Sequence, residues 1–230
     1  MTTATPESLR RWTEQHALIM LLGAGGAWLE HSALLLAAMA AASWLGLLVR
    51  GRGRYAPGGG FGLANTLTAG RALGATALLV IPLHPTWQAI SLWLLMGLDG
   101  LDGWAARRWR TASVFGALFD QESDALLMLT VCLLLFLGGR LEGWILLPGL
   151  LRYGFVLVHQ WGRTRSVVLR GSRFTRSIGV AAGVGLTACL LPQLPAAFAL
   201  WLAAGLSLGL ALSFASSLWQ LYRADGRPAG

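Results

Sequence analysis

Apolar residues fill most of the chain in long runs, which are interrupted by proline, glycine or clusters of arginine. A helix needs about 20 apolar residues to cross a bilayer, with a lower limit of about 17. Six runs after residue 60 reach that length, and we predict a membrane helix in each: 63–83, 86–109, 113–138, 141–161, 175–194 and 196–221. The pattern therefore predicts an all-α, polytopic membrane helix bundle.

The first 60 residues have a pattern of their own. Residues 6–16 carry mixed charge and predict an amphipathic lead-in at the cytoplasmic surface. Residues 17–49 are apolar except for Glu30, His31 and a few small polar residues, which predicts a hairpin of two extra membrane helices turning at Glu30–His31. The same stretch also fits one tilted or surface-lying helix followed by a single span.

A basic, glycine-rich segment marks the best internal boundary. Three arginines precede a strong helix break at Pro57-Gly58-Gly59-Gly60. We therefore divide the chain into three parts: an amphipathic segment, hairpin and linker (1–60), a six-helix membrane core (61–222) and a cytoplasmic tail (223–230).

Charge is sparse and one-sided. Only 12% of residues are charged, and all 18 basic residues are arginine, giving a net charge of +8. In an arrangement of eight alternating spans, the basic clusters fall on one side, and the opposite turns contain only Arg140. The positive-inside rule places both termini in the cytoplasm, as expected for a protein of the bacterial inner (plasma) membrane. Arginines at helix ends favour anionic membrane lipids, and not nucleic acid, as partners.

Four of the ten acidic residues lie close together in an otherwise apolar stretch. Asp99 and Asp102 are three residues apart, and Asp120 and Asp124 are four apart, so each pair shares a helix face. A short polar turn near Thr111 separates the pairs. If the two helices pack antiparallel about that turn, all four carboxylates lie in one layer, ~14–19 Å of helix below it.

Four neighbouring carboxylates cannot all remain ionised without cations. Oxygen ligands at this density suit Mg²⁺ or Mn²⁺, which bind carboxylates and phosphates together. Two ions that share bridging carboxylates would form a clamp for phosphoryl displacement. The alternative is a water-filled structural cavity or a cation path.

Small and basic residues accompany the aspartates. Gly116 lies on the same helical ridge as Asp120 and Asp124, and Gly103 follows Asp102. Glycine at these positions serves close helix packing or leaves room for a nucleotide. Arg107, one turn beyond Gly103, points toward the cytoplasmic side and could neutralise a phosphate.

The full pattern resembles the signature of the CDP-alcohol phosphatidyltransferase family, D-x-x-D-G-x-x-A-R-x(7–9)-G-x-x-x-D-x-x-x-D. Every specified position matches, with eight residues between Arg107 and Gly116. The resemblance implies a six-helix membrane enzyme that displaces CMP from CDP-diacylglycerol or a similar CDP-linked lipid by the hydroxyl of a small alcohol, using Mg²⁺ or Mn²⁺. It is also compatible with a homodimer.

The resemblance assigns roles to individual residues. It implies that Asp99, Asp102 and Asp120 are metal ligands and that Asp124 is a metal-associated general base for the acceptor hydroxyl. It further implies a group of small and basic residues that frame the cytidine diphosphate: Gly103, Ala106, Arg107 and Gly116.

A second motif opens the first core helix. Asn65-x-x-Thr68-x-x-Arg71 is similar to a Pro-Asn-x-x-Thr-x-x-Arg stretch of the family, with Ala64 in place of proline. The resemblance makes these three residues candidates for binding the CDP-lipid. For Asn65 and Thr68, a helix cap and a polar packing contact are the alternatives.

Arginines between residues 152 and 176 are candidates for the acceptor site. Arg152 falls inside an apolar helix, where an arginine is a functional candidate by default. Arg173 and Arg176 occupy the start of the fifth core helix, where related phosphatidylglycerophosphate synthases have basic residues. Together they favour a phosphorylated or carboxylated acceptor such as glycerol 3-phosphate, inositol phosphate or serine.

Two other functions fit parts of the pattern. Intramembrane prenyltransferases also hold magnesium diphosphate with aspartate-rich motifs, but on helices far apart in sequence, whereas both halves here lie within 26 residues. A non-enzymatic divalent-cation transporter or binding protein would explain the aspartates, but it leaves Gly103, Ala106 and Arg107 without a purpose.

Overall fold

The computed structural model describes residues 7–53, 55, 60–108, 113–161 and 173–225, and side chains within them except at 100–108, 159–161, 173–176 and 220–225. The described residues form helices and no strand, which confirms the all-α prediction. The elements are α1 (Glu7–Glu30), α2 (Leu34–Gly51), α3 (Gly62–Val80), α4 (Pro85–Arg108), α5 (Val114–Leu137), a 3₁₀ turn (Gly143–Ile145), α6 (Leu146–Trp161), α7 (Arg173–Ala188) and α8 (Ala196–Asp225).

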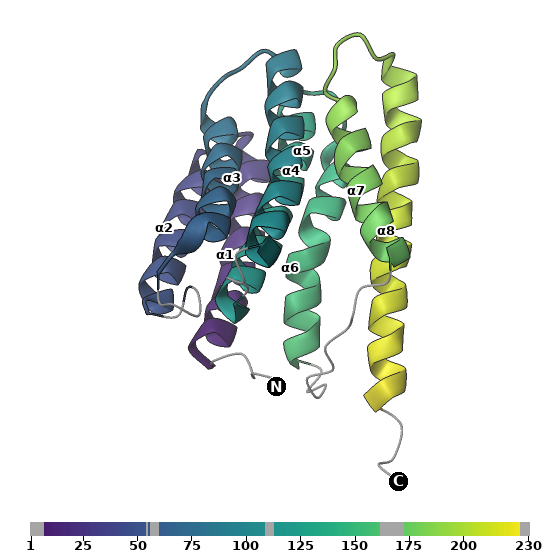
Figure 1. Cartoon of the computed structure of the whole chain (residues 1–230). Coiled ribbons are helices and arrows are strands. Elements are labelled where there is room, and N and C mark those ends of the chain that lie inside the picture. Colours follow the sequence, from purple (N-terminus) through teal and green to yellow (C-terminus); the bar gives the residue numbers. More distant parts are fainter. Residues whose placement is uncertain (1–6, 54, 56–59, 109–112, 162–172, 226–230) are drawn as a thin grey trace.

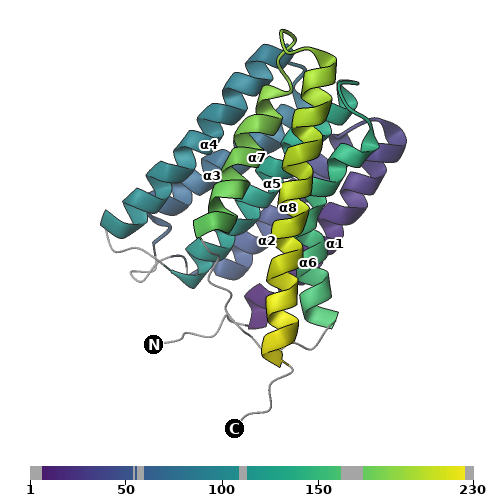
Figure 2. The same cartoon turned by 90° about the vertical axis from the view of Figure 1, so that its right-hand side faces the viewer.

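The helices lie side by side in one bundle, and their directions alternate along much of the chain (Figures 1 and 2). Helix α1 begins, and α2, α4, α6 and α8 end, at the same end of the bundle (Figure 1). We call this the basic end, because the arginine clusters of the sequence flank these helix termini. The arrangement agrees with one-sided charge along the chain.

Helices α1 and α2 form the expected hairpin. Helix α1 ends at Glu30, and the next residue, His31, has a left-handed backbone with φ of 50° that reverses the chain. Small side chains let the helices approach closely; a Cβ on Gly23 would lie 2.6 Å from Cδ1 of Leu36.

The amphipathic lead-in differs from the expectation. Residues 7–16 are the first turns of α1, with no break before the apolar part of the helix. Leu9, Trp12 and His16 are buried in the bundle. The charged residues between them lie on the outer face, so the segment is half core and half surface.

Six helices follow the linker in the order that the apolar runs predict. Helices α6 and α7 have 16 residues each and are shorter than the predicted spans 141–161 and 175–194, because a 3₁₀ turn precedes α6 and α7 ends at Ala188. By length and hydropathy, two described helices qualify as membrane spans, Leu34–Gly51 and Ala196–Trp219. Membrane crossing by each remaining helix stays a prediction.

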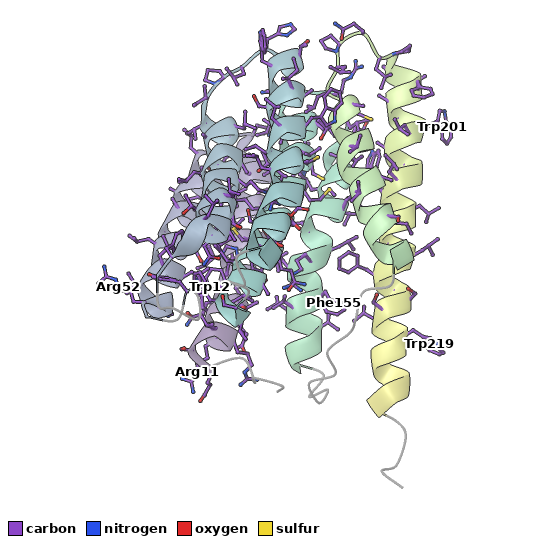
Figure 3. All side chains as sticks on the ribbon, in the orientation of Figure 1. Arg11, Trp12, Arg52, Phe155, Trp201 and Trp219 are labelled. Atoms are coloured by element: carbon purple, nitrogen blue, oxygen red, sulfur yellow. The ribbon has the colours of Figure 1, made fainter. Side chains whose placement is uncertain are left out.

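Large apolar side chains cover the outside of the bundle. Trp201 is 76% exposed on α8, and Leu29 and Leu73 are strongly exposed on α1 and α3. Trp201 and Trp219 project from the outer face of α8 (Figure 3). An extended apolar exterior of this kind is unusual for a monomeric protein in water and fits a lipid environment.

Helix α3, and not the α4–α5 turn, organises the helices that carry the acidic motif. Among the described residues, α3 packs extensively against both α4 and α5, whereas α4 and α5 have at most sparse direct contact. The two helices that carry the aspartates are therefore each held against α3 and do not pack tightly against each other. Helix α5 lies at the centre, is buried along most of its length, and also packs against α6 and α7.

Arg140, the arginine at the end opposite the basic end, caps a helix. It donates from Nε to the carbonyl of Cys189 (3.1 Å) and from Nη2 to those of Leu191 (3.0 Å) and Leu194. These carbonyls follow the last turn of α7, where a cation is favourable. Its position therefore has a local structural explanation and does not conflict with the one-sided charge.

Candidate active site

Three of the four motif aspartates converge on one point. Asp99 comes from α4, and Asp120 and Asp124 come from successive turns of α5. One carboxylate oxygen from each residue lies within 4.8 Å of the others. The predicted common layer therefore holds for these three residues, although α4 and α5 pack mainly against α3 and not against each other.

Arg71 of α3 lies at the centre of this acidic cluster. Its Nη1 donates to Oδ1 of Asp99 and of Asp120, both at 2.9 Å, and its Nη2 donates to Oδ1 of Asp124. The arginine side chain is 1% exposed, whereas the three carboxylate side chains are 42–51% exposed. One buried guanidinium thus holds three carboxylates together and leaves them open on their other side.

This donor set suits a divalent cation. The cluster has two more negative than positive charges when its carboxylates are ionised, and hard oxygen donors are the ligands that Mg²⁺ and Mn²⁺ take. Carboxylates this close repel one another unless positive charge is added. Asp99, Asp120 and Asp124 could therefore hold a metal ion, with Arg71 as a fixed counter-charge.

Several predicted site residues lie outside the described side chains. Asp102, Gly103, Ala106 and Arg107 continue the helix of α4 beyond Asp99, and the structure gives no side-chain placement for them. Arg173 and Arg176 lie in the first turn of α7, and the structure gives no side-chain placement for them either. Their assigned roles stay predictions.

Asn65 and Thr68 are buried on the same face of α3 as Arg71. Asn65 Nδ2 donates to the carbonyls of Phe61 (2.7 Å) and Tyr55 (3.1 Å), and Thr68 Oγ1 donates to that of Ala64 (3.1 Å). For both residues, these contacts fit the alternatives to CDP-lipid binding that the sequence allowed: a contact at the start of the helix for Asn65 and a polar packing contact for Thr68. They join the linker to α3 and leave nucleotide binding by these residues as a proposal.

Gly116 faces protein atoms. A Cβ at this position would lie 3.0 Å from Oδ1 of Asn65 and 3.2 Å from Oγ of Ser113. Ser113 caps α5, since its Oγ accepts from the Gly116 amide (2.9 Å) and donates to the Tyr55 carbonyl (2.6 Å). This geometry supports the close-packing interpretation of Gly116.

Arg152 belongs to a second constellation, which we call the α5–α6 ion pair. Its Nη2 donates to Oε1 of Glu122 at 2.7 Å. Glu122 is 1% exposed and Arg152 is 18% exposed. Glu122 lies two residues from both Asp120 and Asp124, which puts it on the opposite face of α5. The structure therefore does not bring Arg152 to the acidic cluster.

The N-terminal hairpin closes over this ion pair. His16 of α1 stacks edge-on against Tyr153 of α6, with ring centroids 5.9 Å apart, and hydrogen-bonds Ser43 of α2 through Nδ1 at 2.8 Å. Within the described residues, the buried atoms of this region that have no hydrogen-bond partner include His16 Nε2, Glu122 Oε2, Arg152 Nε and Tyr153 OH. The region is polar, enclosed and separate from the acidic cluster.

Two of these partnerships were not predicted from the sequence. Arg71 was a candidate for binding the CDP-lipid, and Arg152 was a candidate for the acceptor site. The signal in the sequence was that each arginine lies within an apolar helix. An arginine in that setting needs a carboxylate partner at the same level of the bundle, and the chain contains few acidic residues. Sequence spacing alone could not say which arginine meets which acid.

Comparison with known proteins agrees with the motif. The family model for CDP-alcohol phosphatidyltransferases matches residues 61–211. A CDP-diacylglycerol–glycerol-3-phosphate 3-phosphatidyltransferase of Cereibacter sphaeroides is 32% identical over 93 residues. That alignment covers 37% of this chain and 42% of the relative, so it spans less than half of either protein. No solved structure gives a significant match.

The matched region contains α3 to α7, about the first half of α8 and the whole acidic motif. This chain belongs to the CDP-alcohol phosphatidyltransferase family. Its apolar helices and this family of membrane enzymes together indicate a membrane protein. The family match favours phosphatidyl transfer over both the prenyltransferase and the cation-transport alternatives.

Proposed function

We propose that the protein transfers a phosphatidyl group from CDP-diacylglycerol, or a similar CDP-linked lipid, to the hydroxyl of a small alcohol and releases CMP. The observation that carries this proposal is the cluster of Asp99, Asp120 and Asp124 on the buried Arg71, within a complete family motif. Phosphoryl transfer needs positioned charge more than covalent chemistry from the protein, and this cluster is a source of positioned charge.

The proposed reaction assigns a task to each part of the cluster. The acceptor oxygen attacks the lipid-side phosphorus, its proton passes to the carboxylate of Asp124, and the bond from that phosphorus to the CMP oxygen breaks. Asp99, Asp120 and the neighbouring Asp102 would hold divalent metal, which when bound offsets the charge of the diphosphate and of departing CMP. Arg71 keeps the carboxylates together, and their open side faces the substrates.

The acceptor is proposed to carry a phosphate or carboxylate. The relative is named for glycerol 3-phosphate, which makes that compound the first acceptor to test. Arg173 and Arg176 are the proposed acceptor contacts at the start of α7. We also propose that the protein resides in a bacterial inner membrane, with its active site toward the cytoplasm, because the arginine clusters flank one end of the bundle.

The direct test is CMP release by the purified protein. CDP-diacylglycerol is supplied with Mg²⁺ or Mn²⁺ and with glycerol 3-phosphate, inositol phosphate or serine in separate reactions. Asp124→Asn is expected to lower the rate by about 10²–10⁴-fold, the usual contribution of a general base. Glu142→Gln, an exposed carboxylate in the loop before α6, is the matched control and should keep full activity.

Two results would overturn the proposal. One is the absence of CMP with every acceptor and both metals from a protein whose helical content is intact. The other is full activity in Asp124→Asn, because that residue would then take no proton. CMP release with only one of the three acceptors would identify that compound as the acceptor substrate.

A further inference from the structure

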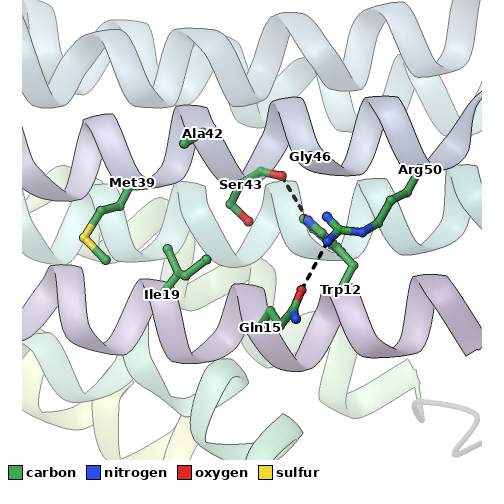
Figure 4. Close-up of a pocket in the computed structure, with 8 residues that line it drawn as sticks. All are labelled: Trp12, Gln15, Ile19, Met39, Ala42, Ser43, Gly46 and Arg50. Atoms are coloured by element: carbon green, nitrogen blue, oxygen red, sulfur yellow. Dashed lines mark hydrogen bonds between the residues drawn. The ribbon is translucent and has the colours of Figure 1, made fainter.

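The N-terminal hairpin has a groove on its outer face, outside the part of the chain that matches the family. The groove is about 340 Å³ and lies between α1 and α2 (Figure 4). Its residues come from both helices: Trp12, Gln15, Ile19, Met39, Ala42, Ser43, Gly46 and Arg50. The acidic cluster, on α3, α4 and α5, shares none of these residues.

The groove has a fixed floor. Trp12 and Ser43 are buried, and the Trp12 indole Nε1 donates to the Ser43 carbonyl at 2.9 Å. Ile19, Met39 and Ala42 line the part farther from the basic end and offer only apolar surface. An alkyl chain is the ligand that such a strip accepts in a membrane.

The other end of the groove carries a positive charge. Arg50 donates to Oε1 of Gln15 at 3.4 Å, across the groove from α2 to α1 (Figure 4). Its side chain folds back over Gly46, where an added Cβ would lie 3.0 Å from Nη1. Among the described residues, Arg50 forms no salt bridge, whereas Arg10 pairs with Glu14 and Arg11 with Glu7.

The depth of this charge matches that of a lipid phosphate. Helix α2 is one of the two helices long and apolar enough to cross a membrane, and Arg50 is in its last turn. Arginine at the end of a span lies at headgroup level, where anionic lipids attract it. The cation and the apolar strip are therefore spaced as the phosphate and an acyl chain of one phospholipid.

We propose that this groove binds an anionic phospholipid, with its phosphate on Arg50 and Gln15 and one acyl chain along Ile19, Met39 and Ala42. A zwitterionic lipid offers the same chain with less net attraction to the arginine. A soluble phosphate offers the charge without the chain. The site requires both, and it is independent of the proposed catalytic activity.

The test is lipid binding measured by native mass spectrometry on the full-length protein in detergent. The probes are phosphatidylglycerol and phosphatidylcholine with identical chains. Wild type is expected to retain phosphatidylglycerol preferentially, and Arg50→Gln should reduce that retention about fivefold. Arg52→Gln is the charge-matched control just beyond α2 and should retain the preference, because Arg52 does not line the groove.

A second variant tests the apolar part without changing charge. Ala42→Phe fills the strip from an exposed position and should lower binding of both lipids. Equal retention of phosphatidylglycerol by wild type and Arg50→Gln would overturn the proposal. So would an equal loss in Arg52→Gln, which indicates diffuse charge, or full competition by inorganic phosphate, which indicates a site without a chain.

Discussion

Helix α5 carries two charged clusters on opposite faces, the acidic cluster and the α5–α6 ion pair. In one the cation is the buried partner, and in the other the anion is. In the acidic cluster the arginine is buried and its three aspartate partners are about half exposed. In the α5–α6 ion pair the carboxylate of Glu122 is buried and Arg152 is partly exposed. The first has excess negative charge open on one side, and the second is neutral and closed.

Because of this difference, the acidic cluster can bind a ligand, whereas the α5–α6 ion pair serves as a contact between two helices. Carboxylates with an open side can exchange water for a metal ion or a phosphate-bound metal. A buried one-to-one ion pair has no spare charge, and its disruption leaves an uncompensated ion in the interior. The two constellations therefore predict opposite responses to substitution and to added cations.

The largest expected effect on folding comes from the ion pair. Arg152→Leu leaves Glu122 buried without its partner and should lower the free energy of unfolding by about 3–5 kcal/mol. Equilibrium unfolding in mixed detergent micelles measures the loss. The double variant Glu122→Leu/Arg152→Leu removes both charges and should recover most of it. A double variant as unstable as the single one would contradict the assignment.

Added divalent cation gives the next effect, at the acidic cluster alone. Wild-type protein with Mg²⁺ or Mn²⁺ at a hundred times the dissociation constant should gain about 2.7 kcal/mol in unfolding free energy. Removal of the metal with a chelator should reverse the gain. Asp99→Asn should shrink it, and Glu122→Gln should leave it unchanged. Equal gains in all three proteins would place the cation elsewhere.

Removal of the central arginine should have a smaller effect on folding than removal of Arg152. Arg71→Met leaves carboxylates that are already half exposed, so we expect a loss of about 1–2 kcal/mol without metal. The same variant should depend more strongly on divalent cation, because the fixed counter-charge is gone. Unfolding curves with and without Mg²⁺ measure both effects. A loss as large as that of Arg152→Leu would remove the distinction between the constellations.

The smallest effect is expected at the start of the helix that both constellations share. Ser113→Ala removes the cap of α5 and the hydrogen bond to the Tyr55 carbonyl, with an expected loss of about 1 kcal/mol. Thermal unfolding measures it. The variant should retain the metal-dependent gain, since no ligand is altered. Loss of that gain would mean that the cap also positions Asp120.

Much of the fold follows from the apolar pattern. The N-terminal hairpin and the order of the six later helices were predictable, because runs of sufficient length and a turn at Glu30–His31 mark them directly. The buried face of residues 7–16 was not, because mixed charge at that helix start is equally typical of a surface segment. The shorter α6 and α7 were missed because apolar loops and apolar helices have the same composition.

The acidic site was predictable in part. Helical spacing and distance from the turn placed Asp99, Asp120 and Asp124 together correctly. The role of α3 in this packing was not predicted, since α4 and α5 each pack against α3 and, among the described residues, have at most sparse contact with each other. Partner choice between arginines and acids depends on which helix faces which, and the sequence of one chain does not contain that information. Arg152 is an example, because the sequence places it inside an apolar helix but does not identify Glu122 as its partner.

The pairing of Arg71 on α3 with carboxylates on both α4 and α5 has a consequence for the order in which the acidic cluster assembles. Arg71 is synthesised before any of its three partners, and if α3 spans the membrane, its guanidinium enters the bilayer without a partner, at a cost of about 2.5–3.5 kcal/mol on insertion scales. Asp99 arrives with α4, and the remaining partners arrive only with α5. Asp99 can balance the single charge of Arg71 as soon as α4 has been made, and the docking of α5 then adds the two carboxylates that give the cluster its excess negative charge.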